Sequence, residues 1–187
     1  MGKIRTNLIF SVLAYGIMLL STPVGAVDVS IKITGTIYIP PCKIKNDTDF
    51  KVPFGNIPLQ KVDGKSFAQP TTMEVSCEYF QGIPYIRLSG GTGQLSGAPD
   101  NVLKTTGANP ATLGIALYQG NSVDPDNPLR LGAGEQGQYG YKIRKGLSAV
   151  NVPSSQFTFT AVPYKLGNSE LNAGKFSASV TMSISYL

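Results

Sequence analysis

The side chains that most often carry out chemistry are scarce in this sequence. The chain has 187 residues, with no histidine, no tryptophan and two cysteines. Without histidine, it cannot form a Ser-His-Asp or Cys-His triad, a histidine-ligated zinc site or an imidazole acid–base pair. Two cysteines are also too few for a four-cysteine zinc site. These classes of enzyme and metal protein are therefore excluded.

The remaining motifs that could indicate a site have simpler explanations. Gly132 to Gly137 spells the dinucleotide pattern G-x-G-x-x-G, but a turn and a strand follow it instead of the helix that would meet a pyrophosphate. Asp124 and Asp126 lie among prolines and lack the further oxygen ligands of a calcium loop, which favours a plain turn. Five aromatic residues could stack on a sugar, but cross-strand packing is the more common role: Tyr79, Phe80, Tyr85, Tyr139 and Tyr141. We therefore expect no catalytic, cofactor-binding or metal site and no cofactor.

The first 26 residues differ from the rest of the chain. A basic start with Lys3 and Arg5 precedes an apolar run over residues 8–20, and small residues lead up to Ala26. This order is typical of a secretory signal peptide cleaved after Ala26. A membrane anchor is the competing interpretation, but the run is shorter than the roughly 20 residues that span a bilayer. We expect a mature chain that begins at Val27.

Export changes the expected role of the two cysteines. Cys42 and Cys77 form an even pair in an oxidising compartment, so the sequence predicts a disulfide between them. In the chain-entropy model, closing a loop of this size stabilises the fold by roughly 3–4 kcal/mol. A reactive thiol is the alternative, although no histidine is available to activate it.

Charge does not indicate a nucleic-acid ligand. The formal net charge is +5, and Lys3 and Arg5 of the expected signal peptide contribute two of these charges. The cluster Lys142, Arg144 and Lys145 is too small for the dense basic stripe of a nucleic-acid interface and is typical of a solvated strand end. We expect no nucleic-acid partner.

Alternation with a period of two dominates the expected mature chain. Residues 27–39 form one long alternating strand, and residues 176–186 place apolar side chains between serines and threonines up to the end. Turn residues separate the other expected strands, at 51–54, 71–77, 85–89, 101–104, 113–118, 139–143 and 156–162. Short strands with this spacing predict a single all-β sandwich. The expected mature chain begins and ends with a long amphipathic strand, which raises the question of what these strands pair with.

The pattern resembles the subunits of chaperone–usher pili. The resemblance rests on the alternating start that runs into Cys42, the paired cysteines, Gly174 fourteenth from the end, and the penultimate Tyr186. Residues 113–120 and 155–160 also carry it, and it covers essentially the whole expected mature chain.

The resemblance implies an incomplete immunoglobulin-like sandwich that lacks its seventh strand. Residues 27–39 would be a donor strand and residues 40–187 the pilin domain. The donor would place five residues in the groove of a neighbouring subunit: Val29, Ile31, Ile33, Gly35 and Ile37. The last strand would be a wall of this subunit's own groove and would bind the chaperone, through Gly174, Phe176, Ala178, Val180, Met182, Ile184, Tyr186 and Leu187.

The function implied is structural: a minor pilin that joins a tip adhesin to the fibre by donor-strand exchange. Its partners would be a periplasmic chaperone, an outer-membrane usher, neighbouring pilins and the adhesin, and its final location the bacterial surface. Another minor or major pilin, or a terminator, is an alternative within the family. A secreted sugar-binding lectin module is the alternative from a different class.

Overall fold

The computed structural model describes residues 29–44 and 50–187. The expected signal peptide, residues 1–26, lies outside the described residues. The chain divides into two compact units, Met1–Ile37 and Tyr38–Leu187. The described part of the first unit, residues 29–37, has no regular secondary structure, and its large apolar side chains are between 76% and 103% exposed.

The second unit is all-β. Its five-stranded sheet has the order β1 (Lys43–Ile44), β2 (Gln69–Ser76), β8 (Ser154–Lys165), β6 (Leu113–Gln119), β4 (Val102–Lys104). A three-stranded sheet has the order β10 (Thr181–Tyr186), β3 (Pro84–Ser89), β7 (Tyr141–Lys142), and a small sheet pairs β5 (Thr106–Gly107) with β9 (Phe176–Ser177). All these pairs are antiparallel. Two short 3-10 helices are η1 (Leu59–Lys61) and η2 (Gly137–Tyr139).

The two larger sheets share one apolar core. Phe157 of β8 and Leu117 of β6 come from the five-stranded sheet, and Leu88 of β3 and Ile184 of β10 come from the three-stranded sheet. Because side chains alternate across a strand, every second residue of these strands points into this layer. The expected all-β, immunoglobulin-like fold is confirmed.

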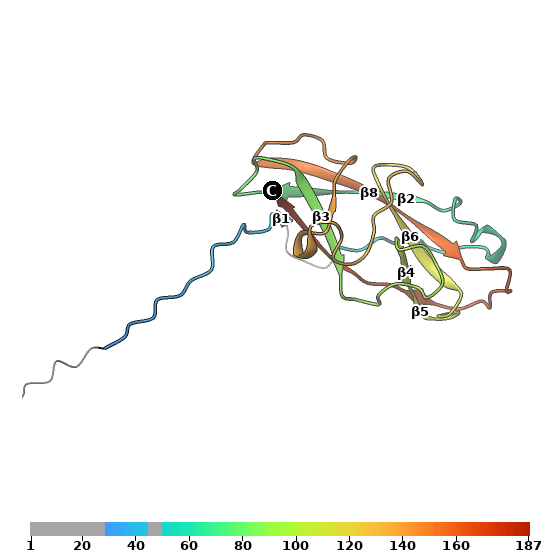
Figure 1. Cartoon of the computed structure of the whole chain (residues 1–187). Coiled ribbons are helices and arrows are strands. Elements are labelled where there is room, and N and C mark those ends of the chain that lie inside the picture. Colours follow the sequence, from blue (N-terminus) through green and yellow to red (C-terminus); the bar gives the residue numbers. More distant parts are fainter. Residues whose placement is uncertain (1–28, 45–49) are drawn as a thin grey trace, which may run out of the picture. The chain divides into compact units, whose positions relative to one another are not determined.

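The Cys42–Cys77 disulfide is present, as predicted. It joins the residue before β1 to the residue after β2, and both cysteines are buried. The Cys42 amide also donates a hydrogen bond to the carbonyl oxygen of Ile184, at 2.7 Å. Figure 1 shows the consequence: the C-terminus lies close to β1 and β3.

Four expected strands differ from the structure. The described part of the first, residues 29–39, has no regular secondary structure, and the expected strand 139–143 is reduced to the two residues of β7 after the end of η2. Residues 51–54 form no hydrogen-bonded strand, although Val52 and Phe54 alternate with exposed neighbours and pack on the core. Residues 176–186 are divided into β9 and β10 by three residues without strand pairing. The alternation in residues 51–54 and 176–186 indicates which side chains are buried, and burial does not by itself require a hydrogen-bonded strand partner.

Candidate functional site

The C-terminal strand has one hydrogen-bonded edge and one open edge. Ile83 and Leu187 exchange both backbone hydrogen bonds, at 2.7 and 3.0 Å, and Lys175 accepts one from Ala108 at 2.9 Å. In an antiparallel ladder the residues of one strand alternate in the edge to which their N–H and C=O groups point. The odd-numbered residues therefore face β3 and β5, and the even-numbered residues face the opposite edge.

That opposite edge lacks a partner over most of its length. Among the described residues, one backbone hydrogen bond is made at this edge, from the Cys42 amide to the Ile184 carbonyl oxygen. Within residues 29–44 and 50–187, the backbone groups of four residues have no hydrogen-bond partner on this side: Phe176, Ala178, Val180 and Met182. We call residues 176–182, seen from this side, the open edge.

The side chains of the same four residues are apolar and only half-buried. They pack against the main core cluster, whereas Ile184 and Tyr186 further along the strand are fully buried. The ring of Phe176 lies 6.3 Å from the ring of Phe54, centroid to centroid. Partly exposed core side chains and unpaired backbone groups therefore lie side by side. An added β-strand would cover the side chains and form hydrogen bonds with the backbone groups.

The open edge is held in place from its other side. At the break between β9 and β10, the Thr92 amide donates to the Ser179 carbonyl at 2.9 Å, and the Thr92 hydroxyl is 3.4 Å from the Ser179 nitrogen, which donates to it. Gly91 precedes this contact with φ +64°, and a β-carbon there would overlap the Ser179 carbonyl group and lie 2.9 Å from Val180 Cα. Thr92 thus replaces a ladder pair where the strand is interrupted.

The start of the strand is held by a pair of asparagines. Asn109, with φ +58°, donates from Nδ2 to the Asn172 carbonyl, and its Oδ1 accepts from the Asn172 amide, both at 2.8 Å. Gly174 follows, and a β-carbon there would lie 2.8 Å from Ala108 Cβ. Gly174 was expected from the sequence and Asn109 was not, although the dipeptide Asn109-Pro110 is a turn signal.

Tyr186 anchors the end of the strand. Its side chain is 1% exposed, and burial raises the pKa of its phenol, partly offset by a hydrogen bond with the Asn151 backbone. Leu187 is half-buried and pairs with Ile83. The residues expected for the groove wall thus lie in β9, in β10, in the break between them and directly beside them, and their role in binding a chaperone stays a prediction.

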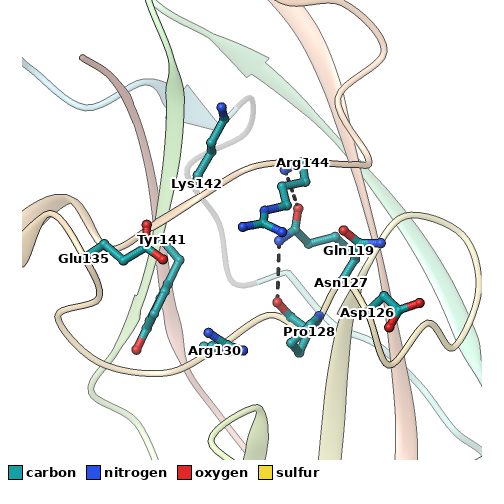
Figure 2. A pocket seen from close by; sticks show the side chains of 9 residues that line it. All are labelled: Gln119, Asp126, Asn127, Pro128, Arg130, Glu135, Tyr141, Lys142 and Arg144. Atoms are coloured by element: carbon teal, nitrogen blue, oxygen red, sulfur yellow. Dashed lines mark hydrogen bonds between the residues drawn. The ribbon is translucent and has the colours of Figure 1, made fainter.

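A small pocket of mixed charge lies on different elements. Figure 2 shows its nine lining residues, which come from the end of β6 and from the segment 126–144. The buried Gln119 accepts hydrogen bonds from the Arg144 and Lys145 amides through Oε1, at 2.8 and 3.1 Å. Charges of both signs line the pocket, three cationic side chains and two carboxylates, so it is not a site of a single sign: Arg130, Lys142, Arg144, Asp126 and Glu135.

Asp124, which the sequence assigned to a plain turn, has a structural role. Asp124 accepts from Lys145 Nζ at 2.9 Å and from Asn127 at 3.0 Å, and these bonds, with Lys145 first, hold the pKa of its carboxyl below the usual value.

Within the described residues, no group of three or more Cys, Asp or Glu could hold a metal ion. The described part of the chain also contains no helix long and apolar enough to cross a membrane.

Comparison with known proteins identifies the family of this chain. The model of the fimbrial protein family matches residues 31–187. The chain belongs to this family. This fimbrial protein is 38% identical to the fimbrial adapter PapF of Escherichia coli over 98% of its own length and 99% of PapF, and 37% identical to the minor fimbrial protein PrsF of the same species over the same shares. The resemblance inferred from the sequence is confirmed.

Solved structures agree with the fold. The structure of the P pilus adaptor subunit PapF covers 81% of this fimbrial protein and is itself fully covered, with 34% identity and a TM-score of 0.53. The P pilus rod subunit PapA is also fully covered, at 17% identity and a TM-score of 0.52, and supports the fold alone. This chain is therefore a structural subunit of a fimbria, built on an immunoglobulin-like fold.

Proposed function

We propose that this fimbrial protein is an adaptor-type minor subunit of a chaperone–usher pilus, joined to its neighbours by donated β-strands. The observation that carries the proposal is the open edge, where four residues present half-buried apolar side chains and unpaired backbone groups together. A strand supplied by another polypeptide would complete both. Similarity to PapF, named as an adapter, over nearly the whole chain supports the adaptor role.

The residues proposed to donate a strand have the complementary character. In residues 29–37 the apolar side chains share one face, and Val29, Ile31, Ile33 and Ile37 are exposed. Gly35 interrupts the row and has no heavy atom within 4 Å of the position of a β-carbon. Alternate side chains of an added strand enter pockets, while its backbone supplies hydrogen bonds. Gly35 would therefore mark a shallow pocket in the neighbour.

The proposed donor strand is long enough to cover an edge of the size of the open edge. At about 3.4 Å per residue, the open edge spans about 20 Å and residues 29–37 span about 27 Å. A donor of that length covers such an edge and leaves residues to cross between two subunits. We keep residues 27–39 as the proposed donor and 40–187 as the proposed pilin domain.

The remaining partners follow from the same proposal. Before assembly, a periplasmic chaperone would cover the open edge, an outer-membrane usher would receive the complex, and a tip adhesin would be one neighbour in the fibre. The protein would act without catalysis and be displayed on the cell surface. The wall residues from Gly174 to Leu187 would contact the chaperone, so Tyr186→Ser and Gly174→Arg should lower the periplasmic yield of the chaperone complex.

A peptide exchange assay tests the donor role. The acceptor is the neighbouring subunit that co-purifies with this protein, still bound to its chaperone, and the donors are synthetic peptides of residues 27–39. We expect the wild-type peptide to displace the chaperone and the Ile33→Asp peptide to fail, because a charge in an apolar pocket is costly. Gly35→Leu should slow exchange by overfilling a shallow pocket.

The matched control is Thr34→Asp, which places the same charge one residue away on the opposite face of the strand. This peptide should exchange like the wild type. Equal activity of the Ile33→Asp and Thr34→Asp peptides, or failure of the wild-type peptide, would show that this face of residues 29–37 does not fill a groove.

A further inference from the structure

Two loops meet at the end of the domain where residues 29–37 join it. The loop 77–83 and the loop 147–153 are tied by hydrogen bonds from the Cys77 amide to the Pro153 carbonyl, at 2.8 Å, and from the Gly82 amide to Asn151 Oδ1, at 3.0 Å. The disulfide fixes Cys42 to the same end. We call these two loops the exit face.

Exposed apolar side chains gather on the exit face. Six large hydrophobic residues outside the segment 29–37 are strongly exposed in the described chain, and three of them belong to this face: Tyr79, Ile83 and Val150, with exposures from 41% to 52%. The other three, Tyr38, Phe50 and Leu59, lie in the segments before β1 and before β2. Exposed apolar side chains that gather on one face are typical of an interaction surface.

The exit face is also almost free of charge. Its two loops contain one charged side chain, Glu78, which is paired with Lys43 at 3.0 Å. The chain terminus at Leu187 borders the face through its pairing with Ile83. Depletion of charged residues and enrichment of tyrosine are the compositional marks of the centre of a protein–protein interface.

Chain length decides which partner can reach this face. Four residues, 38–41, separate Ile37 from Cys42, and five Cα–Cα steps span at most about 18 Å. Pro40 and Pro41 restrict the conformations of this connection further. A subunit that holds Ile37 in its groove must therefore place its body within that distance of Cys42, next to the exit face.

We propose that the exit face is a second contact surface, which packs against the body of the same neighbour that receives the donor strand. This inference rests on the proposed donor-strand function. The donor strand would provide attachment, and the exit face would fix the angle between successive subunits. The surface it meets on the neighbour should be apolar and uncharged.

Hydroxyl-radical footprinting of the assembled proteins tests the proposal. The protein is labelled in its chaperone complex and again after its extension has entered the neighbouring subunit recovered with it from the periplasm, with the chaperone still bound to its own open edge. We expect loss of oxidation at Tyr79 and Val150 on joining. Oxidation of Leu59, which has the same 41% exposure as Ile83, should not change.

Paired variants separate the exit face from strand insertion. Val150→Asp should still join the neighbour but lose the protection of Tyr79, whereas the control Leu59→Asp should retain it. If the oxidation of Tyr79 does not change on joining, or if Tyr79 is already fully protected in the chaperone complex, the proposed contact through the exit face is wrong. The donor-strand function would not be affected by either result. If the joined complex fails to form with wild-type protein, both proposals are wrong.

Discussion

Gly91 controls how the middle of the open edge is held, and its replacement by alanine should loosen that edge. At φ +64°, an L-residue is strained by roughly 1–2 kcal/mol. The new β-carbon would also overlap the Ser179 carbonyl group and approach Val180 Cα to 2.9 Å. Overpacking of this kind costs typically about 1–3 kcal/mol.

Gly93 provides the matched control. It has φ +74° in the same turn, and no heavy atom lies within 4 Å of the position of a β-carbon. Gly93→Ala should therefore suffer the backbone strain alone. The difference between the two variants isolates the contact with the strand, about 1–3 kcal/mol.

The Thr92 amide reports the contact directly, since it donates to Ser179. Hydrogen exchange of this amide, measured by NMR in the chaperone complex, follows the free energy of local opening. Because 1.4 kcal/mol is a factor of ten, Gly91→Ala should exchange about 5- to 140-fold faster than Gly93→Ala. Equal exchange rates in the two variants would refute the steric argument.

Three further predictions concern the stability of the domain. Replacing both Cys42 and Cys77 by serine should lower the free energy of unfolding by about 4 kcal/mol for a 35-residue separation, measured by urea denaturation, and the wild type should show no free thiol when labelled unreduced. Because burial raises the pKa of Tyr186, its contribution to stability is complete below pH 10 and is lost as the pH rises further; Tyr186→Phe should remove that loss, seen as a flatter dependence of the melting temperature on alkaline pH. The pKa of Asp63 is lowered to about 2, chiefly by the Ser66 amide and then its hydroxyl, so its contribution is present above about pH 4 and lost towards pH 2; Ser66→Ala should raise this pKa in an NMR titration.

The strands that carry the core could be predicted because one face of each is buried. Residues 71–77, 85–89, 113–118 and 156–162 were each expected as strands and lie largely within β2, β3, β6 and β8. Alternation fixes their register strongly, since a slip by one residue would move every apolar side chain to solvent.

Residues 51–54 show the limit of the same signal. Val52 and Phe54 alternate and pack on the core as a strand would, yet no ladder forms in this segment. Alternation specifies which side chains are buried, whereas a ladder also needs a neighbouring strand with free backbone groups.

The supports of the open edge could not be found from sequence. Thr92 and Asn109 act on residues 179 and 172, more than 60 positions away in the chain. Each is an ordinary turn residue by composition, and only the folded loops place it against the last strand. The strand itself was predictable because its alternation is local.

The attachment of Cys42 determines how a fibre built from such subunits would respond to tension. A pull on residues 29–37 would enter the domain through Pro40 and Pro41 and divide at Cys42, where the disulfide transmits it to β2 and a hydrogen bond transmits it to the last strand. β2 is paired with β8 along its whole length, so the force would be shared by many hydrogen bonds. Without the disulfide, the same force would act on β1, which has only two residues paired with β2, and the tensile strength of the joint would depend on its oxidation state.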